Sequence, residues 1–297
     1  MLDFTKKTNQ SDIEKKNILK ETPVRPVQVI AVTGGKGGVG KTNISVNLSI
    51  ALAKLNKKIL LFDADLSLAN IDILLNINVN RTLNHVVNHL ASLKDIIIDG
   101  PEGIKMIPAG SGSKQLANLT PAECAGLMNA FDEIESDFDH LIIDTAAGIS
   151  DDVIMFSKAA NEIIIVVCDE PTSITDAYAL IKILYKDHKK NNFHIITNMV
   201  ENFMDGHSLF NKLNRATEQF LELSLNLCGI IPYDDRVKKS VQKQCAVVEA
   251  YPDSLATKAI HRIAKEISQW PIRDYDISDM RFFWHQLLNY KEKYEGL

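Results

Sequence analysis

Short apolar segments alternate with longer helical segments from Val27 onward. The apolar segments are rich in Val, Ile and Leu without alternating polar residues, which is typical of strands covered on both faces. They are Val27–Val32, Ile59–Phe62, Ile104–Ile107, Leu141–Ile143, Ile163–Val167, Phe193–Ile196 and Cys228–Ile231. Between them, apolar residues recur at helical spacing, for example in Thr42–Leu55, Pro121–Ile134, Ile174–Tyr185 and Leu209–Leu223. The pattern predicts an α/β protein with a doubly wound, mostly parallel sheet and helices on both faces.

The two ends of the chain differ from this pattern. Residues 1–26 are polar and mixed in charge, which predicts a flexible arm with a short helix around Asp12–Leu19, or simply a tail without function. The alternating pattern over residues 27–271 predicts one folded domain. Residues 272–297 predict a linker and a last helix from Asp279 to about Tyr294, which Ser278 is placed to cap.

The composition of the chain excludes several classes of protein. The 297 residues are 45% hydrophobic and 24% charged with a net charge of −5, so a large core is expected and coating of nucleic acid is not. The four cysteines lie far apart without a C-x-x-C motif, which indicates reduced thiols. No apolar run has transmembrane length, and no signal segment begins the chain. We therefore expect a cytoplasmic protein with no direct nucleic-acid partner.

A phosphate-binding loop follows the first predicted strand and precedes a predicted helix. Glycines let successive N–H groups turn toward one anion, and the helix N-terminus adds positive charge. Lys41 is expected to neutralise the β- and γ-phosphates of ATP, and the Thr42 hydroxyl to bind Mg²⁺. The alternative is a glycine-rich turn that binds nothing. The candidate nucleotide-binding residues are Gly35, Lys36, Gly37, Gly38, Val39, Gly40, Lys41 and Thr42.

Carboxylates follow two other predicted strands. Asp63 and Asp65 end the second one, where ligands bind in open α/β sheets, and Asp144 ends Leu141–Ile143. One carboxylate could hold the Mg²⁺ shell and another orient the attacking water, although Asp63 and Asp65 could also cap the next helix. We expect Asp63 and Asp144 at the metal. Gly148 closes this segment with a flexible backbone able to sense the γ-phosphate.

The loop, with its second lysine at Lys36, resembles the deviant Walker A motif of the MinD/ParA ATPases. The resemblance implies that Lys36 reaches the nucleotide of a partner subunit in an ATP-bound homodimer. Lys36, Lys41 and Asp65 then become the catalytic residues, with Asp65 positioning water in switch I and Asp144 and Gly148 belonging to switch II. It also implies that Asn198 bonds the adenine edge and that Pro232 and Asp234 pack against the base; turn chemistry explains the Pro232–Asp235 run almost as well.

Several longer segments resemble one branch of that family, the bacterial flagellar number regulators (FleN/FlhG), from about residue 27 onward. They are Val27–Thr42, Asp144–Gly148, Cys168–Lys182 and Ile231–Asp235. The resemblance implies slow, dimer-coupled ATP hydrolysis and restraint of a FleQ-like σ54-dependent activator. Some relatives also stimulate an FlhF-type GTPase through an N-terminal D-Q-A-x-x-L-R motif. Ser11–Lys16 does not match it, so that partner is not implied by the motif.

The last predicted helix is amphipathic. Its broad apolar face carries Met280, Phe283, Trp284, Leu287 and Leu288. Such a face can lie in a membrane interface, as the resemblance implies for the ATP-bound dimer at the inner membrane or cell pole, or it can pack on the domain itself.

Other ATPase classes fit less well. An electron-transfer ATPase needs cluster-ligating cysteines beyond its switches, and an iron–sulfur scaffold needs a C-terminal C-x-x-C. A spatial-positioning ATPase for the division site or for DNA partition remains the alternative. For partition, however, Lys238, Lys239 and Lys243 provide only a small basic cluster.

Overall fold

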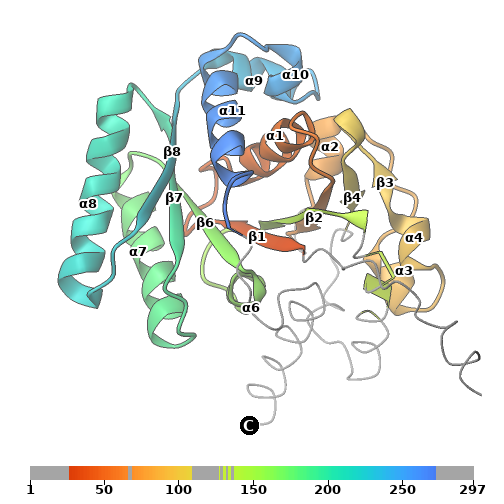
Figure 1. Ribbon diagram of the computed structural model, residues 1–297, viewed down its shortest axis with the longest axis horizontal. Coiled ribbons are helices and arrows are strands. Elements are labelled where there is room, and N and C mark those ends of the chain that lie inside the picture. Colours follow the sequence, from red (N-terminus) through yellow and green to blue (C-terminus); the bar gives the residue numbers. More distant parts are fainter. Residues whose placement is uncertain are drawn as a thin grey trace, which may run out of the picture.

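The computed structural model describes residues 27–65, 69–108, 127, 130, 131, 133, 134 and 137–271. Eight strands form one sheet in the order β3-β4-β2-β5-β1-β6-β7-β8 (Figure 1). All neighbouring pairs are parallel except β3 with β4, which is antiparallel. The predicted doubly wound, mostly parallel sheet is confirmed, and the sheet gains a short antiparallel edge strand that the sequence pattern did not indicate.

The strands are β1 (Gln28–Thr33), β2 (Ile59–Ala64), β3 (Ile98–Asp99), β4 (Lys105–Ile107), β5 (His140–Thr145), β6 (Glu162–Val167), β7 (Phe193–Val200) and β8 (Asn226–Pro232). The helices are α1 (Lys41–Ala53), α2 (Ile71–Leu75), α3 (Leu83–Val87), α4 (Leu93–Ile96), η2 (Pro101–Gly103), α6 (Asp151–Ala159), α7 (Pro171–Lys186), α8 (Phe203–Leu221), α9 (Asp235–Gln242), α10 (Val247–Ala250) and α11 (Leu255–Ile267).

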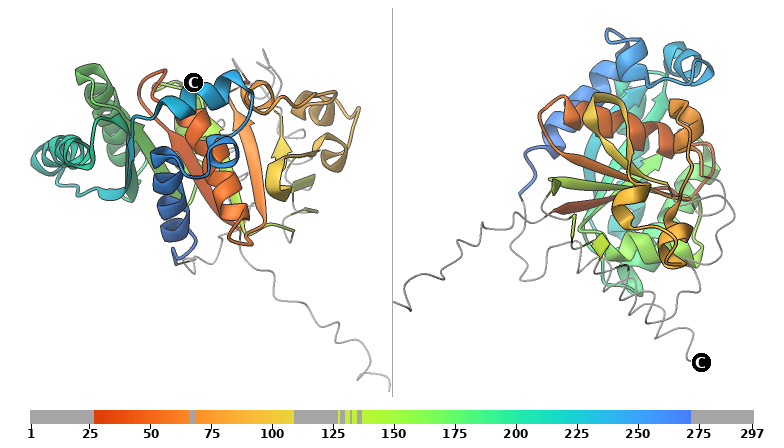
Figure 2. Two further views of the ribbon diagram at one scale, coloured as in Figure 1. Left: turned by 90° about the horizontal axis from the view of Figure 1, so that it is seen from above. Right: turned by 90° about the vertical axis from the view of Figure 1, so that its right-hand side faces the viewer.

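Helices cover both faces of the sheet and create two hydrophobic cores (Figures 1 and 2). Helices α3, α4, α6, α7 and α8 contribute to one core. Helices α1, α2, α10 and α11 contribute to the other. Every residue of β1, β2, β5 and β6 is buried, which explains why these strands are continuous apolar runs.

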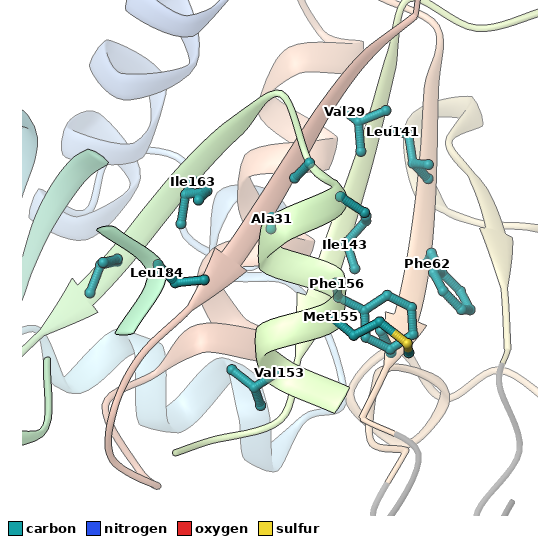
Figure 3. Packing of buried hydrophobic residues seen from close by; sticks show 14 of the residues in the cluster. Val29, Ala31, Phe62, Leu141, Ile143, Val153, Met155, Phe156, Ile163 and Leu184 are labelled. Atoms are coloured by element: carbon teal, nitrogen blue, oxygen red, sulfur yellow. The ribbon is translucent and has the colours of Figure 1, made fainter. Parts of the chain in front are cut away.

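Aromatic and branched side chains fill the space beneath α6 (Figure 3). Phe62 of β2 meets Phe156 of α6 edge to face, with ring centroids 5.7 Å apart and planes at 77°. Val153 of α6 and Leu141 of β5 belong to the same core and are completely buried. This packing fixes β2 and β5 side by side, which places the two carboxylate-bearing strand ends together.

The helix α1 is buried on most of its circumference, because α10 and α11 cover the side that faces away from the sheet. The periodicity of the sequence predicts almost the full length of α1. It does not predict α11, the helix that covers α1. The predicted helix at Asp12–Leu19, most of Pro121–Ile134 and the C-terminal helix at Asp279–Tyr294 lie outside the described residues.

Candidate nucleotide-binding site

The glycine-rich loop joins β1 to the first turn of α1. Gly38 (φ 80°) and Gly40 (φ 95°) adopt left-handed backbone conformations, which side chains disfavour. Gly40 is the N-cap residue of α1, and the helix has no side-chain cap there and no acidic residue in its first turn. The first N–H groups of the helix are therefore suited to an external anion.

Two glycines of the loop are needed for close approach to neighbouring elements. A Cβ at Gly35 would lie 2.2 Å from the carbonyl carbon of Asp176 in α7, and one at Gly40 would lie 2.5 Å from Nδ2 of Asn198. Gly37, by contrast, has no atom within 4 Å of such a Cβ. The loop is thus seated on α7 and β7 and open on its outer side.

Lys41 points into the site. Its side chain is 8% exposed, and Nζ donates a hydrogen bond to the carbonyl oxygen of Lys36 at 3.3 Å. Burial lowers the pKa of Lys41, while Asp144 and Asp65 act in the opposite direction. A buried ammonium held by a backbone carbonyl can exchange that partner for phosphate oxygens.

Asp144 lies at the centre of the site, at the penultimate position of β5, and is 1% exposed. Its carboxylate accepts hydrogen bonds from Oγ of Ser45 at 2.8 Å and from the side chain of Thr42. Burial raises the pKa of Asp144 to about 6, against the effect of these two hydrogen bonds and of Lys41. The structure therefore brings together Lys41, Thr42 and Asp144 from two strand–helix units.

Asp63 pairs in register with Asp144 on the neighbouring strand. Its carboxylate accepts backbone N–H groups from Asp65 at 3.3 Å, Asn70 at 3.1 Å and Ile71 at 3.2 Å. Burial and then the charge of Asp144 raise the pKa of Asp63 to about 7. Asp63 thus holds the start of α2, as the capping alternative describes, while lying beside the predicted metal carboxylate.

Asp65 is half-buried, and its charge acts on both Lys41 and Asp144. It begins the predicted switch I, whose next residues, 66–68, lie outside the described part of the chain. Gly148 of the predicted switch II has φ 100° and donates its N–H to the carbonyl oxygen of Gly34 at 3.0 Å. Both switch residues therefore contact or face the phosphate loop.

Lys36 lies on the other side of the loop. Nζ donates to Oε2 of Glu170 and to Oγ1 of Thr172, the latter at 2.9 Å. The hydrogen bond to Glu170 raises the pKa of Lys36. The two lysines of the loop consequently point to different places, Lys41 into the site and Lys36 toward the start of α7.

The residues predicted at the base lie at the ends of β7 and β8. Nδ2 of Asn198 donates to the carbonyl oxygen of Val39 at 2.9 Å and so braces the loop. Pro232 ends β8 beside Val200. Asp234 accepts N–H groups from Arg236 at 2.9 Å and Ala256 at 3.3 Å, which fixes the starts of α9 and α11. The contacts of Asn198 and Asp234 are structural ones, and the base contacts stay predictions.

The donor set fits Mg²⁺. This ion prefers oxygen ligands and usually combines one or two carboxylates with phosphate oxygens and water. Thr42 and Asp144 supply a hydroxyl and a carboxylate at the foot of the loop. Among the described residues, no group of three or more His, Cys, Asp or Glu side chains could hold a metal ion without such additional ligands.

Four contact residues were not predicted from the sequence. Ser45 follows Thr42 by three residues and so faces the same side of α1, which is a usable signal. Glu170, Thr172 and Asp176 contact the loop only because α7 begins beside it. The segment that contains them, Cys168–Lys182, resembles the flagellar regulators, but its pattern did not indicate a contact with the loop.

The predicted membrane residues Met280, Phe283, Trp284, Leu287 and Leu288 lie outside the described residues. Within the described part of the chain, no helix has the length and apolarity needed to cross a bilayer.

Comparison with known proteins identifies a family model and relatives that match this chain. The ParA family model, described as an NUBPL iron-transfer P-loop NTPase, matches residues 25–268. The antiactivator FleN of Pseudomonas aeruginosa is 48% identical over 267 residues, covering 90% of this chain and 95% of that protein. The flagellum site-determining protein YlxH of Helicobacter pylori is 34% identical over 236 residues, covering 79% of this chain and 80% of that protein.

A solved structure shares the fold. The septum site-determining protein MinD of Pyrococcus horikoshii, complexed with Mg-ADP, superimposes with a TM-score of 0.66 at 23% identity, covering 82% of this chain and 96% of that one. The family model and the two relatives show the family, and the solved structure shows the fold. This chain belongs to the MinD/ParA family of P-loop ATPases.

Proposed function

We propose that this chain is an ATP-dependent switch that forms a homodimer and regulates flagellar number by restraining a FleQ-like σ54-dependent activator. The observation that carries the proposal is the similarity to FleN over nearly the whole of both chains. The second flagellar relative, YlxH, supports the same role.

ATP with Mg²⁺ is the proposed ligand. The uncapped start of α1 and Lys41 would bind the phosphates, and Thr42 and Asp144 would hold the metal. The metal would neutralise charge on the β- and γ-phosphates. Asp65 would orient the attacking water, and Gly148 would exchange its hydrogen bond with Gly34 for one to the γ-phosphate. The reaction is ATP hydrolysis to ADP and phosphate.

In this proposal the chain switches between a monomer and an ATP-bound dimer. ATP can stabilise a dimer only through contacts that ADP does not make, so the γ-phosphate must lie at or near the interface. Lys36 is the residue proposed to cross it. The outer side of the loop, at Gly37 and Gly38, is exposed and has no atom within 4 Å of a built Cβ at either glycine, so a second copy has room to approach.

The test is the oligomeric state of the full chain by light scattering with no nucleotide, with ADP and with ATP. We expect a monomer in the first two conditions and a dimer with ATP. A mass that does not change with nucleotide would contradict the proposal. Pull-down of a σ54-dependent activator by the ATP-bound form, but not the ADP-bound form, tests the partner.

The alternative is spatial positioning for the division site or DNA partition. Arg236, Lys238 and Lys239 are exposed on α9 and form the start of a small basic surface. Steeply salt-dependent binding of nonspecific DNA would favour partition. The iron-transfer description of the family model finds no support in this chain, because its cysteines form no C-x-x-C motif.

A further inference from the structure

A cavity lies beside the start of the predicted switch I. Its volume is about 220 Å³, and none of the described residues that line it belongs to the phosphate loop. Its walls come from β2, α2, β3, β4 and the segment before α3, toward the β3 edge of the sheet (Figure 1). The cavity is therefore distinct from the candidate nucleotide-binding site, although Asp63 borders both.

Most of the cavity wall is apolar. It includes Leu61, Ile71, Ile98 and Met106, each from a different element. Ligand pockets typically combine such walls with a few polar groups that orient the ligand. An apolar cavity of about 150 Å³ already binds a benzene ring, so this one admits a ligand built on one ring with a short chain.

The charges of the lining select the ligand by sign. Its polar side chains are those of Asp63, Asp72 and Thr82. Asp63 is 4% exposed and Asp72 is half-buried. Within the described part of the chain, no lysine, arginine or histidine lines the cavity. Carboxylates without an opposing cation repel anions and attract a positively charged group, so phosphates and carboxylic acids fit poorly here.

The hydrogen-bonding capacity of the two carboxylates points to a donor. Asp63 accepts backbone N–H groups from Asp65, Asn70 and Ile71, and Oδ1 of Asp72 accepts the N–H of Ile73 at 2.8 Å. A carboxylate offers about four acceptor positions, so both retain capacity. An alkylammonium group carries only N–H donors and would favour the ionised form of Asp63.

We propose that this cavity binds a small organic amine, with the apolar body of the ligand between α2 and the strands and its ammonium group at the carboxylates of Asp63 and Asp72. Such a ligand would touch Asp63 and Ala69, which lie on either side of Asp65. It would thereby act on the residue proposed to orient the attacking water. The inference does not depend on ATP-driven dimerisation, because all the lining residues belong to one chain.

Phenethylamine is the probe, titrated without nucleotide into the full chain carrying isotope-labelled Ile and Met methyl groups. The NMR signals of Ile71, Ile98 and Met106 should shift with a Kd of about 1 mM or below, and that of Ile44 in α1 should not. Phenethyl alcohol has nearly the same shape without the charge and should bind at least about threefold more weakly. Hydrocinnamate, an anion, should not bind measurably.

Two variants locate the site, each with a control. Val79 lines the cavity, so Val79→Trp should fill it and abolish binding. Val241→Trp places the same side chain on α9, outside the cavity, and should leave the Kd unchanged. Asp72→Asn should raise the Kd about three- to tenfold, whereas Asp253→Asn removes an exposed carboxylate elsewhere and should not.

Each outcome decides the proposal. It is overturned if the three methyl signals do not shift, if the alcohol binds as tightly as the amine, or if either Val79→Trp or Asp72→Asn keeps the wild-type Kd. Weaker binding in both variants with wild-type binding in both controls supports it. Asp72→Asn keeps the test decisive if Val79→Trp does not fold. Because no nucleotide is present, none of these results bears on the ATP-dependent switch.

Discussion

At the scale of single residues, the site is defined by charges held in unusual environments. Lys41 and Asp144 are buried, and each would be unfavourable alone. Each also moderates the pKa shift that burial causes in the other. Such perturbed groups cluster at functional sites because catalysis needs pKa values that are matched to the task of each group.

Substitution of the two lysines of the loop should affect ATP binding differently. Lys41→Ala should lower affinity for a fluorescent ATP analogue about 10- to 100-fold, since it removes a charge-assisted contact to phosphate. Lys36→Ala should leave that affinity in the monomer nearly unchanged, because its ammonium lies on Glu170. Equal loss in both variants would contradict the separate positions of the two side chains.

Asp144→Asn should stabilise the nucleotide-free protein at high pH. The folded-state pKa, about 6, lies above the ordinary value of 3.8, so the ionised carboxylate destabilises the fold increasingly as pH rises from about 4 to 6 and fully above that. Thermal unfolding should show a gain of about 1–3 kcal/mol at pH 8, or several degrees in Tm, and almost none near pH 4.

Asp253→Asn is the control for this measurement. Its carboxylate is exposed, so its replacement should change Tm equally little at both pH values. A stability gain from Asp144→Asn that does not depend on pH would indicate that charge burial is not its cause.

At the scale of elements, the loop, α1 and α7 form one packed unit. The loop ends in the uncapped helix α1 and rests on the backbone of α7 through Gly35. Close packing tolerates little extra volume. The position of the loop therefore depends on the lack of a side chain at Gly35 as much as on the side chains around it.

Gly35→Ala should therefore destabilise the protein. The added methyl group would overlap backbone atoms of Asp176 that cannot move without displacing α7. Overpacking of this kind costs about 1–3 kcal/mol, which thermal unfolding without nucleotide would detect. Gly37→Ala is the matched control, since open space surrounds that position. An unchanged Tm for Gly35→Ala would mean that the loop is not seated on α7.

At the scale of the whole molecule, the strand order assembles the site. The ends of β2, β5, β1, β6, β7 and β8 lie along one edge of the sheet. They bring Asp63, Asp144, the loop, Glu170, Asn198 and Pro232 into one row, although these residues are spread over much of the chain. A ligand at this edge can therefore contact the ends of several strands at once.

The C-terminal residues carry a prediction at this scale. Removing residues 279–297 should abolish co-sedimentation of the ATP-bound protein with anionic liposomes, because the predicted apolar face of that segment would be lost. Nucleotide affinity should persist. If the full chain does not bind liposomes and the truncated protein loses thermal stability, the segment packs on the domain.

The sequence by itself determined the class of fold and the position of the phosphate loop. It also indicated Lys41, Thr42 and Asp144 as candidate site residues. Strand burial and loop chemistry are local properties, so they leave local patterns. The same patterns were insufficient for α11 and for the antiparallel strand β3, which depend on distant neighbours.

Only the tertiary structure decided which residues meet. It inserted β5 between β1 and β2, which put Asp144 beside Asp63, and it set α7 against the loop, which gave Lys36 its partners Glu170 and Thr172. The physical reason is that contacts between residues far apart in the sequence follow from strand order and packing. A sequence pattern read along the chain does not contain that order.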